Sequence, residues 1–70
     1  MSEAVYRNYD AEALYAQYNN RAMTYHEKGE YDLAIKDCRE AIRLKPDDVK
    51  AYYNRGIAYH EKGEYDQAIK

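Results

Sequence analysis

Two histidines and a single cysteine are the side chains of this chain best suited to metal binding or nucleophilic catalysis. His26 and His60 each open the segment HEKGEYD, so that an imidazole stands near glutamate and aspartate carboxylates in two places. Neither histidine belongs to an HExxH or HxxxH spacing, which would place two imidazoles on one face of a helix. Both histidines recur because the whole segment recurs. The pattern therefore predicts no metal site.

Cys38 would need a neighbouring base to act as a nucleophile. It stands instead on an apolar stripe with Ala34 and Ala41, which is typical of a buried, unreactive thiol. The sequence offers no Ser/His/Asp arrangement, no phosphate-binding loop and no pair of acids that can be assigned to a pocket. We therefore expect a protein that is not an enzyme and that carries no cofactor.

The composition argues against several other functional classes. The chain has 11 Lys and Arg residues against 13 Asp and Glu, with the signs interspersed, whereas a nucleic-acid platform shows a basic excess or stripe. No apolar stretch approaches the ~20 residues of a membrane span, and residues 1–14 lack the apolar core of a signal peptide. A single cysteine forms no intrachain disulfide. We expect a cytoplasmic protein with no nucleic-acid or membrane partner.

A chain of 70 residues is at most one small domain, and a single core of that size contributes no more than roughly 3–5 kcal/mol. All ten aromatic residues are tyrosines, whose hydroxyl groups must reach water or a partner. A core built on tyrosine has to be thin, with every ring near a surface. This composition favours a layered helical array over a compact globule.

An internal repeat organises the chain. The segment YNNRAMTYHEKGEYDLAIK at residues 18–36 returns as YYNRGIAYHEKGEYDQAIK at residues 52–70, an offset of 34 residues. The two segments differ at only five of 19 aligned positions. The chain therefore contains about one and two-thirds units of a 34-residue repeat, preceded by an N-terminal extension.

Each unit is predicted to form a helix, a turn and a second helix. Tyr18, Ala22 and Tyr25 recur at i, i+4 and i+7, as do their counterparts in the second unit, and this spacing marks one face of a helix. Gly29 and Gly63 are predicted to end these helices with a positive φ. No segment shows the period-2 alternation of a strand, so the predicted fold class is all-α.

The second helix of the first unit is predicted to start near Tyr31 and to stop before Pro46. Its predicted buried face comprises Ala34, Ile35, Cys38, Ala41 and Ile42. Asp47 or Asp48 can cap the helix that follows, and Asp32 is spaced to pair with Lys36 at i,i+4.

A 34-residue helix–turn–helix unit of this kind resembles the tetratricopeptide repeat (TPR). The residues that carry the resemblance are Tyr18, Ala22, Tyr25, Gly29, Tyr31, Ala34, Ala41 and Pro46 in the first unit, and Tyr52, Gly56, Tyr59, Gly63, Tyr65 and Ala68 in the second. Arg21 and Arg55 depart from the pattern, since leucine is frequent there, and Cys38 stands where an aromatic residue is frequent. The resemblance implies an extension (1–14), one repeat (15–48) and a truncated second repeat (49–70), folded as antiparallel hairpins in a short right-handed solenoid.

The resemblance also implies a scaffold that binds a peptide or a helix of a partner protein. In such arrays the first helix of each hairpin lines a concave groove. Carried over by position, the groove residues are Asn19, Asn20 and Met23 in the first repeat and Lys50, Tyr53, Asn54 and Ile57 in the second. The alternative role of Met23 and Ile57 is to pack the two hairpins together.

The second unit stops at Lys70, so its predicted second helix has less than two turns and is too short to be stable alone. Either the chain is a fragment of a longer array, or a second chain covers the apolar residues left open. We expect both, with association as a homodimer or a higher homo-oligomer. The candidate contact residues are Val5, Tyr6, Tyr9, Tyr59, Tyr65 and Ile69. The alternative is a purely structural element, natural or engineered, whose only partner is another copy of itself.

Residues 1–14 contain good helix formers and no glycine or proline. The first helix is therefore expected to start near Ser2 or Glu3 and to continue to Lys28, with a start at Asp10 as the alternative. The extension can either fold back as a cap on the array or reach a neighbouring chain, and the sequence leaves both open.

Overall fold

The computed structural model describes the backbone of residues 3–69 and the side chains of residues 13–69. It contains helices α1 (Glu3–Glu27), α2 (Tyr31–Leu44) and α3 (Val49–Ala68). The described backbone has no strand, and the all-α prediction is confirmed. None of these helices combines the length and the apolar character needed to cross a membrane.

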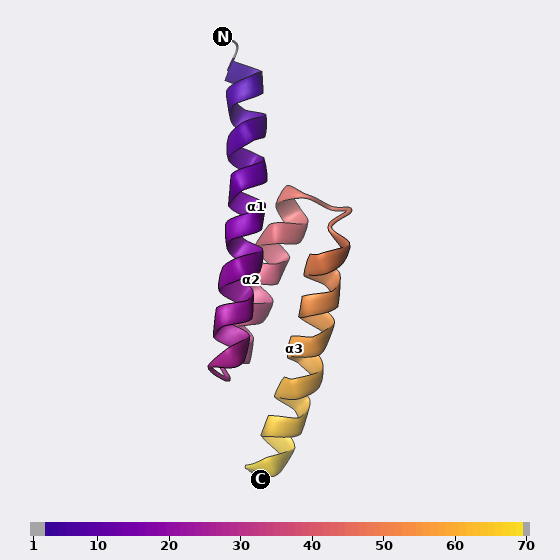
Figure 1. The fold of residues 1–70 in the computed structure, drawn as a ribbon. Helices are drawn as coiled ribbons and strands as arrows, with labels where there is room; N and C mark the ends of the chain where they lie inside the picture. The colour runs from indigo at the N-terminus through magenta and orange to yellow at the C-terminus, as the bar shows by residue number, and fades with distance from the viewer. Residues whose placement is uncertain (1–2, 70) are drawn as a thin grey trace.

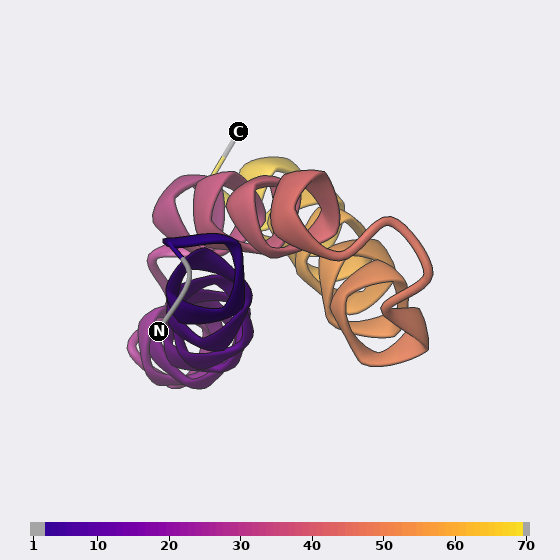
Figure 2. The ribbon, with the colours of Figure 1, turned by 90° about the horizontal axis from the view of Figure 1, so that it is seen from above.

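The three helices run alternately down, up and down the molecule (Figure 1). Helix α2 packs against both α1 and α3, whereas α1 and α3 contact each other less. Figure 2, viewed from above, shows α1 and α3 on two sides of α2, so that the three helices form an arch. The first half of α1 extends beyond α2, and the molecule is 56 Å long.

The turn between α1 and α2 is built around Gly29. Its φ of 77° lies in the left-handed region, where a residue without Cβ is favoured. The Gly29 N–H donates to the carbonyl of His26 at 3.0 Å, and the Glu30 N–H donates to the carbonyl of Tyr25 at 2.9 Å. This pair of bonds is the Schellman motif, which satisfies carbonyls left open at a helix end. The prediction that Gly29 ends the first helix is confirmed.

The corresponding prediction for Gly63 is wrong. Gly63 lies inside α3, which continues without a break to Ala68, and no separate helix begins at Tyr65. The residues after Gly63 in this chain are too few to form a second helix with an apolar face of its own. Continuing α3 instead gives each added residue a backbone hydrogen bond without the cost of a new helix nucleus.

The core between the helices is thin. The buried apolar residues among the described side chains are Ala22, Ala34, Ile35, Cys38, Ala41, Ala51 and Ala58. Alanines at the crossing points let the helix backbones approach closely, and the Tyr25 ring packs against Ala34, Ile35 and Ala58. Ile42, predicted to be buried, is half-buried.

Helix α3 begins at a side-chain cap. The Asp48 Oδ1 accepts a hydrogen bond from the Ala51 N–H at 3.3 Å, which satisfies one of the open N–H groups of the first turn. Of the two caps that the sequence allowed, the structure uses Asp48. Asp32 pairs with Lys62 of α3 at 2.7 Å, whereas the sequence spacing favoured Lys36.

Candidate functional site

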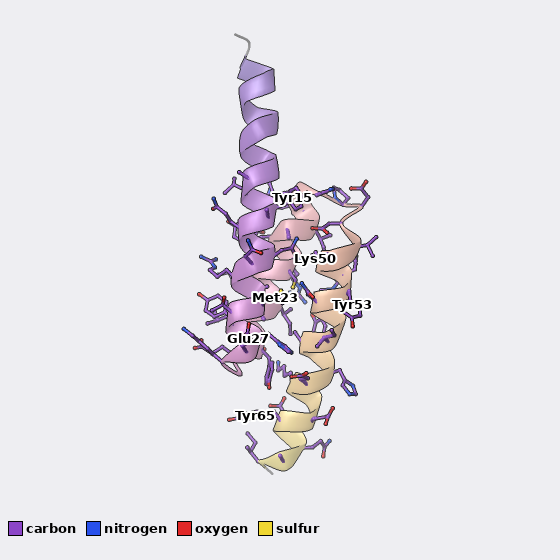
Figure 3. All side chains as sticks on the ribbon, viewed as in Figure 1. Tyr15, Met23, Glu27, Lys50, Tyr53 and Tyr65 are labelled. Atoms are coloured by element: carbon purple, nitrogen blue, oxygen red, sulfur yellow. The ribbon has the colours of Figure 1, made fainter. Side chains whose placement is uncertain are left out.

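A pocket of about 190 Å³ opens on the face of the arch where α1 and α3 come together. Its lining residues are Ala22, Met23 and His26 of α1, Ala34 of α2, and Tyr53, Asn54 and Ile57 of α3. In Figure 3, Met23 and Tyr53 lie at about the same level on the two helices. The volume is below the ~300 Å³ at which small-molecule sites begin, and it suits a single side chain of a larger ligand.

The centre of this pocket is apolar and accessible. The Met23 side chain is 45% exposed and Tyr53 is 68% exposed, whereas Ile57 is half-buried. Methionine adapts its shape to irregular partners, and tyrosine offers a large apolar ring with a polar tip. Exposed apolar side chains gathered in a concave surface are typical of a recognition site.

Two polar groups flank the apolar centre. The Asn54 Nδ2 is buried and has no hydrogen-bond partner among the described residues. Such a donor is costly to leave unpaired. The His26 Nε2 is also buried, and it lies 3.0 Å from Glu61 Oε2 without the geometry of a hydrogen bond.

Two contacts between distant parts of the chain hold α1 beside α3. At one end, Asn19 donates from Nδ2 to Asp48 Oδ2 at 2.6 Å, and Asp48 is the residue that caps α3. At the other end, His26 of α1 meets Glu61 of α3. The pocket lies between these two contacts, so the spacing of its walls is set from both ends.

The structure brings four of the seven predicted groove residues together, namely Met23, Tyr53, Asn54 and Ile57. Asn20 and Lys50 are exposed but do not line the pocket. Asn19 does not face the groove as predicted. It is only 3% exposed, and its amide donates a hydrogen bond to Asp48. Its role in the structure is to join α1 to the start of α3.

A buried carboxylate on α2 was missed by the sequence analysis. Asp37 is 2% exposed and accepts two bonds of 2.7 Å from the Arg21 guanidinium of α1. This hydrogen bond and charge raise the pKa of Arg21 above its ordinary value. The sequence carries only a partial signal, because Asp37 lies on the apolar stripe of α2, whereas the side-chain orientations that bring it to Arg21 are not determined locally.

The candidates for metal binding and nucleophilic chemistry fall in separate places. Within the part of the chain that the structure describes, no three His, Cys, Asp or Glu side chains cluster to hold a metal ion. His60 pairs with Glu64 along α3 at 2.7 Å. Cys38 is fully buried, and this burial, followed by the charge of Asp37, raises the pKa of its thiol.

The predicted self-association residues of the second repeat are exposed on α3 and just after it. Tyr59 is 45% exposed, Tyr65 is 53% exposed and Ile69 is 66% exposed. The Tyr59 hydroxyl accepts a bond from Arg39 of α2 at 2.5 Å, and the Tyr65 ring lies edge-on to Tyr31 with centroids 6.2 Å apart. Val5, Tyr6 and Tyr9 lie outside the described side chains.

Comparison with known families agrees with the repeat and with the helical hairpins. A family model described as TPR repeat matches residues 23–63, which is more than half of the chain. The chain belongs to the TPR family. TPR repeats generally mediate protein–protein interactions and generally serve as non-catalytic scaffolds. The matched range includes every residue that lines the pocket except Ala22. No solved structure matches the chain at a significant level.

Proposed function

We propose that this TPR chain is a protein-interaction module that holds a peptide or a helix of a partner protein in the pocket between α1 and α3. The observation that carries the proposal is the combination of accessible apolar side chains, Met23 and Tyr53, with an unpaired amide donor on Asn54 in one small pocket. Both kinds of group are needed to recognise a peptide, because side chains and backbone must be contacted together.

The size of the pocket suggests the mode of binding. One apolar side chain of the partner enters between Met23 and Ile57, and the Tyr53 ring covers it from α3. A turn of the Asn54 side chain then presents its Nδ2 to a backbone carbonyl of the partner. Pairing this donor removes a penalty of about 1–3 kcal/mol that the free chain bears, so the bond favours the complex.

The test begins with a ligand selected from a random peptide library displayed on phage. Affinity for the selected peptide is then compared between the unchanged chain and the double variant Tyr53→Ala/Asn54→Ala. We expect a loss of at least tenfold, roughly the cost of removing one central contact of an interface. Lys36→Ala is the matched control, since Lys36 is exposed on α2 and does not line the pocket. Equal affinity of the double variant and the unchanged chain would remove the pocket from consideration.

A second candidate function is assembly with another copy of the chain. It is favoured by the exposure of Tyr59 and Tyr65 on α3 and of Ile69 just after it, because exposed apolar side chains gathered on one part of a molecule form a surface suited to association. The first part of α1, which extends beyond α2, is available to reach a neighbouring copy (Figure 1). In this role the chain would be a structural element whose partner is itself.

Solution mass tests the assembly. Light scattering over a range of concentrations is expected to give a mass that rises above the 8.3 kDa of one chain, and Tyr65→Ser/Ile69→Ser is expected to shift that rise to higher concentration. A constant mass of one chain at millimolar concentration would contradict the assembly and would leave the peptide pocket untouched.

A further inference from the structure

The pocket between α1 and α3 has apolar walls and a polar group toward each end. Asn54 lies toward one end, and His26 lies toward the other, where it meets Glu61. Asn54 and Glu61 are seven residues apart on α3, which corresponds to about 10 Å along a helix axis. All of these residues precede Gly63, so the site does not depend on how the second copy of the repeat ends.

The polar atoms at the Glu61 end of the pocket are close together but not bonded. The His26 Nε2 is buried and has no hydrogen-bond partner among the described residues. The Glu61 Oε2 lies 3.0 Å from this nitrogen, in a direction that does not meet the geometry of a hydrogen bond. A buried polar atom without a partner costs free energy, so a ligand group that bonds these atoms would be favoured.

A hydroxyl group suits this pair of atoms, because its single oxygen both donates and accepts. It can accept from an N–H at the His26 Nε2 while it donates to the Glu61 Oε2. In the other imidazole tautomer it can donate to Nε2 instead. A ligand ammonium group only donates, and a ligand carboxylate would be repelled by the charge of Glu61. The hydroxyl is therefore the group that fits either tautomer.

The apolar walls decide which hydroxyl-bearing side chain fits. Met23, Ile57 and the Tyr53 ring border a volume of about 190 Å³. Serine and threonine carry the hydroxyl next to their own backbone, so they would leave these walls uncovered. Tyrosine carries its hydroxyl beyond an aromatic ring, and such rings pack favourably against other rings and against the sulfur of methionine. The combination of apolar walls and a polar end therefore favours tyrosine.

We infer that the pocket selects a tyrosine of the partner peptide, an inference that rests on the proposed function and adds the identity of the anchoring side chain. The tyrosine ring lies between Met23 and Ile57. Its hydroxyl bonds the His26 Nε2 and donates to the Glu61 Oε2, while a neighbouring backbone carbonyl of the peptide accepts from Asn54. One residue of the peptide thus pairs the polar groups at both ends of the pocket.

The first measurement is the residue preference of the peptides that the full chain selects from the phage library. We expect tyrosine to recur at one position, in peptides whose affinity depends on Tyr53 and Asn54. Replacing that tyrosine by phenylalanine should weaken binding at least about tenfold, because the ring still fills the walls while the polar atoms stay unpaired. Equal affinity of the tyrosine and phenylalanine peptides would overturn the inference.

A variant at His26 tests where the hydroxyl binds. His26→Phe keeps an aromatic ring and removes its nitrogen atoms, so the ratio of affinities for the tyrosine and phenylalanine peptides should fall to about one. Both peptides are measured on the same variant, so a change in its stability affects them equally and leaves the ratio informative. A ratio that stays at its original value in His26→Phe would show that the hydroxyl is not bound at this end of the pocket.

A pair of glutamate variants provides the matched comparison. Glu61→Gln should lower the ratio of affinities, because a neutral amide oxygen accepts a hydrogen bond less strongly than a carboxylate does. Glu64→Gln is the control, since Glu64 pairs with His60 along α3 and does not line the pocket. An equal effect of the two variants would mean that the response reflects the overall charge of α3 and not a bond to Glu61.

The phosphorylated form of the tyrosine peptide tests the charge of the site. A phosphate group adds about two negative charges, and none of the described residues that line the pocket is lysine or arginine. With the Glu61 carboxylate at the end of the pocket, we expect saturable binding of this peptide to be lost. Retained binding of the phosphorylated peptide would contradict the placement of the hydroxyl beside Glu61.

The selection also separates failure of this inference from failure of the proposed function. Peptides that depend on Tyr53 and Asn54 but carry leucine, methionine or lysine at the anchoring position would refute the preference for tyrosine and leave the peptide pocket in place. Selection of no peptide, or of peptides that bind independently of those two residues, would remove the pocket as a binding site, and the preference for tyrosine with it.

Discussion

Residues 26–32 and residues 60–66 have the same sequence, HEKGEYD, and they have different structures. The first copy ends α1, turns at Gly29 and begins α2. The second copy lies entirely within α3, with Gly63 as an ordinary helical residue. Since the seven residues are identical, the difference must come from what surrounds them.

The two copies differ in the apolar residues that follow them in the sequence. After the first copy come Ala34, Ile35, Cys38 and Ala41, all of which are buried. After the second copy the chain has only Gln67, Ala68, Ile69 and Lys70, and the first three are exposed. Turning the chain back costs helical hydrogen bonds, and packing a second helix repays them. Glycine permits the turn, and downstream packing decides whether it forms.

The largest expected effect follows from supplying that packing. We predict that extending the chain beyond Lys70 with a copy of residues 37–48 breaks α3 at Gly63 and creates a second hairpin. NMR chemical shifts of the Gly63 Cα and amide should move from helical values to those of Gly29, and Arg55 should acquire a carboxylate partner. An extension of equal length with its apolar residues changed to serine is the control and should leave α3 unbroken. An unbroken α3 in the first extension would mean that downstream packing does not decide whether the chain turns at Gly63.

Replacing glycine by alanine should have opposite effects on stability in the two copies. The stability lost at Gly29 should be larger than the stability gained at Gly63. Gly29→Ala places a Cβ at a φ of 77°, which costs about 1–2 kcal/mol for an L-residue. We therefore expect the free energy of unfolding, measured by urea titration with circular dichroism, to fall by that amount. An unchanged or higher stability would mean that the turn at residues 26–32 can rearrange at no cost.

Gly63→Ala should stabilise the chain. The new methyl group meets nothing within 4 Å, and alanine is favoured over glycine inside a helix by about 1 kcal/mol. The urea midpoint should rise accordingly. The extended chain provides a sharper version of the comparison, because there Gly63→Ala should become destabilising if the second hairpin has formed. Stabilisation in both chains would show that α3 remains continuous after extension.

The parts of the fold that sequence reasoning could find are those that local chemistry controls. The Gly29 turn, the start of α2 at Tyr31 and the cap at Asp48 each follow from a few neighbouring residues. Gly63 could not be interpreted in this way, because its local sequence is the same as that of Gly29. Only the balance between helix extension and distant packing separates the two.

The residues of the candidate site also divide into those that local sequence places correctly and those that depend on contacts between distant parts of the chain. Met23, Tyr53 and Ile57 could be placed on a common face by the repeat spacing, and the structure brings them to one pocket. Asn19 could not be placed correctly, since its bond to Asp48 joins residues 29 positions apart across two helices. The pair Arg21–Asp37 also crosses between helices, and it depends on two side-chain orientations that neither residue's neighbours determine.

The smallest expected effect concerns thiol reactivity, which reports how well each copy of the repeat is packed. Cys38 is fully buried on α2, and burial raises the pKa of its thiol, so that the reactive thiolate is both scarce and inaccessible. Ellman's reagent at pH 8 should modify it at least about a hundredfold more slowly in the folded chain than in urea, because a core of about 3–5 kcal/mol limits exposure by that factor or more.

Ala68→Cys in a Cys38→Ser background is the matched probe of the second copy. Ala68 stands 34 positions after Ala34, which is 1% exposed, but Ala68 itself is exposed near the end of α3. Its thiol should therefore react at nearly the rate of an unfolded control. In the extended chain this thiol should become protected, because a second hairpin would bury position 68 as the first hairpin buries Ala34. Protection of position 68 in the 70-residue chain would mean that the second copy already turns at Gly63, and the contrast between the two copies would disappear.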